Sequence, residues 1–80
     1  MILNMRLTLV NWRDSRMYFE QVSTDSDFSV CEIESIGFLV SEGDDYVVLC
    51  RDAIEEECRG VVVIPRENII SMRNISRVVE

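Results

Sequence analysis

The chain has 80 residues, a formal net charge of −7 and an apolar content of 48%. This length allows one small domain with a thin core and excludes a multidomain enzyme or a large α/β fold. The apolar content is that of a globular domain rather than of a disordered chain. The negative charge argues against a nucleic-acid-binding surface unless basic residues gather locally.

The missing residue types narrow the chemistry further. The sequence contains no histidine and no lysine, so the usual general base and the commonest zinc ligand are absent. Three cysteines, Cys31, Cys50 and Cys58, lack a C-x-x-C spacing and are expected to be small buried thiols in a reducing compartment. The carboxylates stand in runs typical of solvated loops, so we expect no enzymatic activity, no metal site and no cofactor.

The sequence also gives an expectation for the protein's location. No stretch approaches the roughly 20 apolar residues of a membrane span. Residues 1–6 lack the basic start and long apolar stretch of a signal peptide. We therefore expect a cytoplasmic protein that does not contact a membrane.

Short β-rich runs separated by turns predict five strands. The runs cover residues 6–12, 30–42, 46–50, 61–64 and 69–75. Five short strands with one long connection predict an all-β fold, a small, strongly bent antiparallel barrel.

The connections differ in kind. Residues 43–45 are typical of a tight turn, and the acidic stretch 52–57 is expected to be a loop. Pro65 should end the fourth strand and lead into one 3₁₀ turn over residues 66–68. Gly37 marks a place where the second strand can bulge or bend sharply. Residues 14–29 are expected to form either a long loop or a short helix.

Acidic residues gather in the middle of the chain. Residues 25–58 contain eleven acidic residues and one arginine, whereas the segments on either side are mildly basic. A compact fold either brings these opposite charges together or presents them on different faces to a neighbouring copy. The sequence leaves both arrangements open.

The fourth predicted strand is apolar on both faces. Val61-Val62-Val63-Ile64 has no polar residue, and such strands are usually covered on both sides. Left open, they are an aggregation hazard. We therefore expect self-association through the last two strands. The candidate interface residues are Val61, Val62, Val63, Ile64, Ile69, Ile70 and Met72. The alternative is that the long connection, which carries Met17, Tyr18 and Phe19, covers the second face within the same chain.

Two stretches resemble the two motifs of the Sm-like family. Residues 36–49 place a glycine before an aliphatic residue, an acidic turn and an apolar strand. Residues 60–72 combine an apolar strand, a tight turn and an isoleucine-rich last strand. The ending Ile64-Pro65 followed by a short turn is also similar to Src-homology-3-like domains. A looser resemblance, carried by residues 10–15, 37–40, 44–49 and 63–65, links the chain to short phage and prophage proteins of Sm-like type.

The resemblance implies ring assembly rather than RNA binding. In Sm rings the last two strands of neighbouring subunits pair, which here means residues 61–64 and 69–75. RNA-binding members use an Asp and a nearby Asn in the first motif and Arg-Gly in the second. Here the Asn position falls on or near Val47, and the Arg-Gly position reads Pro65-Arg66 or Arg66-Glu67. The family's uracil pocket is therefore not preserved.

A ligand site is a further hypothesis. Trp12 and Tyr46 belong either to the core or to a groove in which they stack on a base or a peptide. Arginines suit phosphate because of their planar fork. The candidate ligand-binding residues are Trp12, Arg13, Tyr46, Arg66 and Arg73.

The sequence thus favours a non-catalytic, self-associating binding module, with phage origin implied by the resemblance. One alternative is a sponge that sequesters a phosphate-containing nucleotide signal of host defence. A second is an RNA-binding Sm-like protein. A host protein is a further possible partner, because an acidic chain can occupy a nucleic-acid-binding surface by mimicking phosphate.

Overall fold

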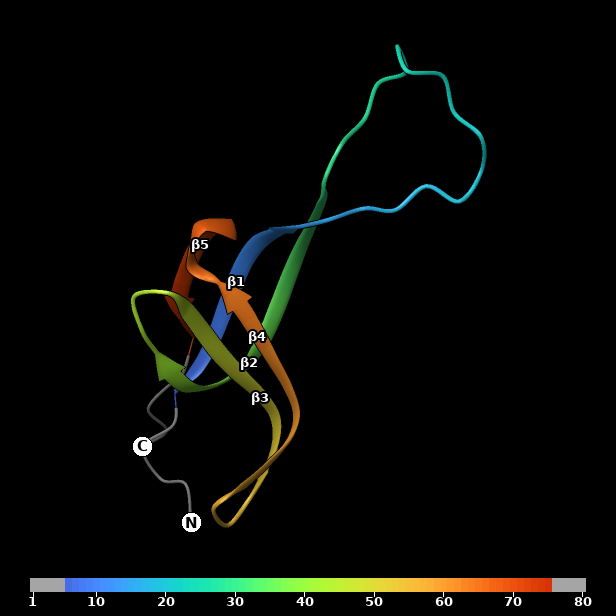
Figure 1. Cartoon of the computed structure of the whole chain (residues 1–80). Helices are drawn as coiled ribbons and strands as arrows, with labels where there is room; N and C mark the ends of the chain where they lie inside the picture. The colour runs from blue at the N-terminus through green and yellow to red at the C-terminus, as the bar shows by residue number, and fades with distance from the viewer. Residues whose placement is uncertain (1–5, 76–80) are drawn as a thin grey trace.

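The structure of the chain is a computed structural model, and it describes residues 6–75. It contains five strands and one 3₁₀ turn, and the predicted all-β class is confirmed (Figure 1). The elements are β1 (Leu7–Asp14), β2 (Cys31–Glu42), β3 (Tyr46–Ile54), β4 (Glu57–Pro65), η1 (Arg66–Asn68) and β5 (Ile69–Asn74). The turn η1 follows Pro65 as the sequence predicts, because proline fixes the backbone and has no N–H for the ladder.

All five strands belong to one antiparallel sheet in the order β4-β3-β2-β1-β5. β4 and β5 lie at the two edges and do not pair with each other. Within residues 6–75 the hydrogen-bonded sheet is therefore open rather than closed. Both edges of the described sheet can accept a further strand.

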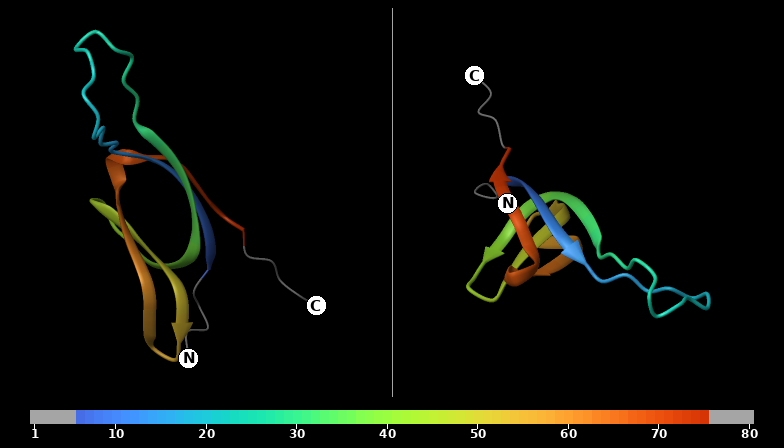
Figure 2. Two further views of the ribbon diagram at one scale, coloured as in Figure 1. Left: turned by 90° about the vertical axis from the view of Figure 1, so that its right-hand side faces the viewer. Right: turned by 90° about the horizontal axis from the view of Figure 1, so that it is seen from above.

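β2 joins the two halves of the sheet. Its residues 31–38 pair with β1, and its C-terminal part, from Phe38 onward, pairs with β3. The register of the second ladder shifts between Leu39 and Ser41, just after the glycine that the sequence singles out. A Cβ atom on Gly37 would lie 2.9 Å from the carbonyl oxygen of Cys50. Glycine thus permits the close crossing that curves the sheet over itself, as Figure 2 shows.

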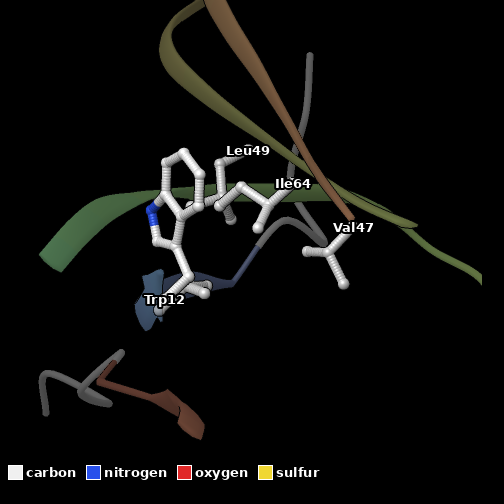
Figure 3. Close-up of a cluster of buried hydrophobic side chains, with 5 residues drawn as sticks. Trp12, Val47, Leu49 and Ile64 are labelled. Carbon is white, nitrogen blue, oxygen red and sulfur yellow. The ribbon is translucent and has the colours of Figure 1, made fainter. Parts of the chain in front are cut away.

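The core fills the concave side of this curved sheet. Val10 and Trp12 come from β1, Val47 and Leu49 from β3, and Ile64 from β4. Figure 3 shows the side chains of Trp12, Val47, Leu49 and Ile64 gathered into one cluster. Strand alternation places these residues on one face, and that face buries them against each other.

The acidic stretch is not a loop, so that prediction is wrong. β3 continues to Ile54 and β4 begins at Glu57. The ladder continues outward through the pairs Asp52 with Arg59 and Ala53 with Cys58. Pairing with the opposite strand overrides the low strand propensity of the acidic residues, whose side chains remain in solvent. Glu55 takes the positive φ of 55° that the tight turn requires.

The connection from β1 to β2 is a long loop rather than a helix. Residues 15–30, which we call the arm, have no regular secondary structure. The arm extends away from the sheet in every view (Figures 1 and 2). The described structure measures 55 × 24 × 22 Å along its principal axes, which fits an elongated body with a projecting arm.

Candidate interaction surfaces

The convex side of the sheet, which we call the outer face, carries an apolar band. It combines residues from four strands: Leu7, Leu9, Ile36, Phe38, Val48, Val61 and Val63. Ile36, Val61 and Val63 are 59%, 51% and 55% exposed. These side chains lie opposite the core across a single layer of sheet. Their exposure identifies a surface suited to a partner.

The β4 edge is apolar on both faces, as the sequence predicts. Val62 packs against the core cluster and Ile64 is fully buried in it. Val61 and Val63 point to the outer face and stay exposed. Of these candidate interface residues, Val61 and Val63 present their side chains to a partner. Ile64 belongs to the core of its own chain.

The β5 edge divides in a similar way. Ile69 and Met72 pack against the core cluster, whereas Ile70 is 46% exposed. Ile70 stands at a register shift, because Ile69 pairs with Trp12 and Ser71 pairs with Asn11. Among the candidate interface residues on β5, Ile70 is therefore the most exposed.

The arm does not cover the outer face of its own chain. It leaves the ends of β1 and β2 and projects beyond them (Figure 1). Val61 and Val63 accordingly remain about half exposed. The structure therefore does not bear out the alternative in which the long connection covers the second face of its own chain.

The arm itself exposes large apolar side chains. Met17 and Phe19 are 73% and 89% exposed, and Val22, Phe28 and Val30 are exposed as well. Tyr18 and Phe28 form an edge-to-face pair, with ring centroids 5.6 Å apart and an interplanar angle of 71°. This pair joins the two sides of the arm near the sheet.

Polar contacts also order the arm. The Nη1 atom of Arg16 donates a hydrogen bond to Oγ of Ser29 over 3.1 Å. Hydrogen bonding to Arg16, and then to Ser29, lowers the pKa of the Tyr18 phenol below its ordinary value. Near the tip, Ser23 donates to Asp25, and this hydrogen bond lowers the pKa of the Asp25 carboxyl. The arm therefore has a defined base and a defined turn despite its lack of regular structure.

Trp12 is a core residue. Its side chain is 8% exposed, and its Nε1 atom donates a hydrogen bond to Oγ of Ser35 over 3.0 Å. The ring fills the interior between β1 and β3 (Figure 3). A buried, hydrogen-bonded indole has no free face on which to stack a base.

Tyr46 and Arg66 lie near each other at the start of β3 and the end of β4. Tyr46 is 49% exposed and pairs with Pro65. Arg66 donates from Nε to the carbonyl oxygen of Gly43 over 3.2 Å and from Nη2 to Oε1 of Glu42 over 3.2 Å. The guanidinium of Arg66 thus connects the two turns at this end of the sheet. A carboxylate already occupies the place that a phosphate would need.

Arg13 and Arg73 line two separate hollows. Arg13 contributes to one of about 530 Å³, together with Asn68 and Ile70. Arg73 contributes to one of about 410 Å³, together with Arg6. The structure therefore does not bring the five candidate ligand-binding residues into one site. Sequence reasoning missed the proximity of Arg6 to Arg73, because no local pattern shows that β5 brings them together.

The cysteines are free thiols with different exposure. Cys50 is buried, whereas Cys31 and Cys58 are half-buried. The Cys50 thiol contacts the carbonyl oxygen of Asp52 at 2.9 Å. Hydrogen bonding to Cys50, with some burial, raises the pKa of the Cys58 thiol. Among residues 6–75, no group of three or more acidic or cysteine side chains is arranged to hold a metal ion.

No helix in the described part of the chain is long and apolar enough to cross a membrane. Comparison with protein-family models, curated proteins and solved structures finds no match to the chain.

Proposed function

We propose that this chain is a non-catalytic binding module that works as a homo-oligomer, in which β4 of one copy pairs with β5 of the next. The observation that carries this proposal is the pair of open edges. β4 and β5 each have one neighbouring strand in the described sheet. An exposed apolar edge strand is a template for pairing with another chain.

The side chains at the two edges support the same pairing. Val61 and Val63 flank the β4 edge, and Ile70 lies on β5. A β4–β5 contact between copies is heterologous, because it uses two different surfaces. Repeated contacts of this kind close into a ring when the rotation between copies permits.

We propose further that the curved sheet is a small barrel of Sm-like or Src-homology-3-like type. The strand order, the crossing at Gly37 and the 3₁₀ turn after Pro65 support this assignment. In such an assembly β4 and β5 of one chain do not pair with each other. Each pairs instead with a strand of a neighbouring copy. The resemblance to phage and prophage proteins supports a phage origin, and the free thiols fit the reducing environment of a host cytoplasm.

The edge contact is tested by placing a charge on β5. Ile70→Asp puts a carboxylate at the proposed junction, so we expect the oligomer to dissociate in sedimentation-velocity runs at concentrations where the wild type is assembled. Ile54→Asp is the matched control, because Ile54 is similarly exposed but lies at the tip of the β3–β4 hairpin. An Ile70→Asp variant that sediments like the wild type would contradict β4–β5 pairing.

A second candidate function is binding of a small phosphate-containing nucleotide. The observation that favours it is the hollow lined by Arg6 and Arg73. Two arginines in one hollow suit a phosphate group, although Glu42 also lines it. Protein purified gently from cells would then carry bound material with nucleobase absorption, and Arg73→Ala would release it. Purified protein free of such material would reject this candidate.

RNA binding and binding to a host protein have weaker support. Val47, at the Asn position of the first motif, is fully buried in the core, so it cannot contact a base. An RNA contact would show affinity that falls steeply with salt. A host partner remains compatible with the acidic β3–β4 hairpin, but no residue geometry singles it out.

A further inference from the structure

The arm and the outer face are two apolar surfaces that both stay exposed within residues 6–75 of one chain. Phe19 is 89% exposed and Met17 is 73% exposed on the arm. Ile36 and Val63 are more than half exposed on the outer face. The figures agree that the arm points away from the strands (Figures 1 and 2). Within residues 6–75, neither surface is covered by the other.

Charge indicates how the two surfaces fit together. The arm carries Glu20, Asp25 and Asp27 against Arg16 alone. The register places Arg73 beside the outer apolar band, since Arg73 pairs with Leu9. Arg59 lies at the other end of the band, where its partner Asp52 offsets its charge.

Two further acidic residues of the outer face lie toward the arm. Glu32 and Glu34 pair with Arg13 and Asn11, in the half of the sheet from which the arm projects. An acidic arm tip would therefore be attracted most to the β5 side of the apolar band, where Arg73 pairs with Leu9.

We propose that the arm of one copy packs on the outer face of a second copy, and that the second arm packs reciprocally on the first copy. This inference rests on the proposed function, since it names a further element through which the module self-associates. The apolar side chains of the arm cover Ile36, Val61 and Val63 of the opposite copy. The arm's carboxylates lie beside Arg73 of that copy.

The area available favours reciprocal exchange over a one-way contact. A buried aromatic side chain covers about 150–250 Å². With Phe19 and Phe28 exposed by 89% and 53%, one arm holds roughly 200–350 Å² of aromatic area to bury. Two arms and the faces that receive them reach roughly 800–1,400 Å² before the aliphatic residues are counted. This approaches the roughly 1,200–2,000 Å² of a stable interface, whereas one arm gives half as much.

Arm exchange and edge pairing have different symmetry. Reciprocal exchange is isologous and joins copies in pairs, whereas β4–β5 pairing is heterologous and forms rings. A closed assembly that uses both contacts contains an even number of subunits. Removing the arm contact would leave an assembly of half the mass, and removing the edge contact would leave pairs.

The test uses a variant of the arm that cannot disturb the core. Met17→Ser/Phe19→Ser changes the two most exposed apolar side chains of the arm. Native mass spectrometry is expected to show half the wild-type mass for this variant. If the wild type is a dimer, the variant is expected to be a monomer. Ile54→Ser is the control, because it removes an exposed isoleucine outside both contacts and should leave the mass unchanged.

Cross-linking locates the arm directly. A photoreactive benzoylphenylalanine replaces Phe19, and the protein is assembled from copies grown with light and with heavy nitrogen. We expect cross-links between light and heavy copies at Ile36, Val61 or Val63. Cross-links confined to one copy, or directed to positions off the outer face, would overturn the proposal.

The outcomes separate this inference from the proposed function. An arm variant that keeps the wild-type mass overturns arm exchange but leaves edge pairing standing. If the arm variant loses mass and the Ile70→Asp variant keeps the wild-type mass, arm exchange is supported and edge pairing is rejected. A wild-type protein that is monomeric at all concentrations overturns both.

Discussion

Gly37 lies where β2 passes closest to β3. A Cβ atom at this position would approach the carbonyl oxygen of Cys50 to 2.9 Å and Cβ of Leu49 to 3.1 Å. The main chain of β3 cannot move aside without breaking its ladder. The absence of a side chain at Gly37 is therefore a condition for the curvature of the whole sheet.

We predict that Gly37→Ala lowers the free energy of unfolding by about 1–3 kcal/mol, the usual range for an overpacked site. Urea unfolding followed by tryptophan fluorescence measures the change, because Trp12 reports on the core. Gly43→Ala is the control, since the nearest atom to its added Cβ is 3.6 Å away. Equal stability of the two variants would show that the crossing is looser than described.

Neighbouring residues on β4 have opposite environments. Ile64 is fully buried, whereas Val63 is 55% exposed on the outer face. We predict that Ile64→Ala costs about 2–5 kcal/mol of unfolding free energy through lost burial and a cavity. Val63→Ala should change the stability of the isolated chain by less than about 0.5 kcal/mol. Urea unfolding at low protein concentration separates the two, and a comparable loss for both would refute the assigned register.

At the scale of the elements, the sequence located the strands but not their ends. Pro65 and the turn after it were predictable, because proline cannot continue a ladder. The extension of the β3–β4 hairpin to Ile54 and Glu57 was not predictable from strand propensity, because pairing across the hairpin overrides the low propensity of its acidic residues. Trp12 and Tyr46 looked alike in sequence, and only the fold separates the buried ring from the exposed one.

The arm shows what a sequence pattern leaves undecided. Its apolar residues predict contact with a surface, but they do not say whether that surface belongs to the same chain. The polar contacts at its base, between Arg16, Tyr18 and Ser29, come from opposite sides of the loop. These contacts join the two sides of the arm at its base.

The pKa of Tyr18 reports on this base. Arg16 stabilises the phenolate, so the Tyr18 pKa lies below its ordinary value of 10.0 and the ring ionises at lower pH than a free tyrosine. We predict that Arg16→Gln raises this pKa toward the ordinary value. Carbon-13 NMR of labelled tyrosine, with Tyr18→Phe to assign the signal, measures both titrations. An unchanged titration in Arg16→Gln would mean that the two side chains are not in contact.

For the whole molecule, the open sheet is the feature with the largest consequence. Its edges, β4 and β5, lie at opposite ends of the strand order. The apolar pattern of residues 61–64 correctly predicted two apolar faces, and the structure places Val61 and Val63 on the exposed one. The five candidate ligand-binding residues were not gathered into one site, because sequence alone gives no distances between strands. The case for assembly therefore rests on surfaces rather than on a pocket.

The most direct test of this account is native mass spectrometry of the wild-type protein, purified gently and measured over a range of concentrations. The account predicts a discrete closed oligomer whose mass is a whole multiple of the 9.3 kDa chain. A monomer at every concentration would contradict it, because the open edges and the outer face would then need no second copy.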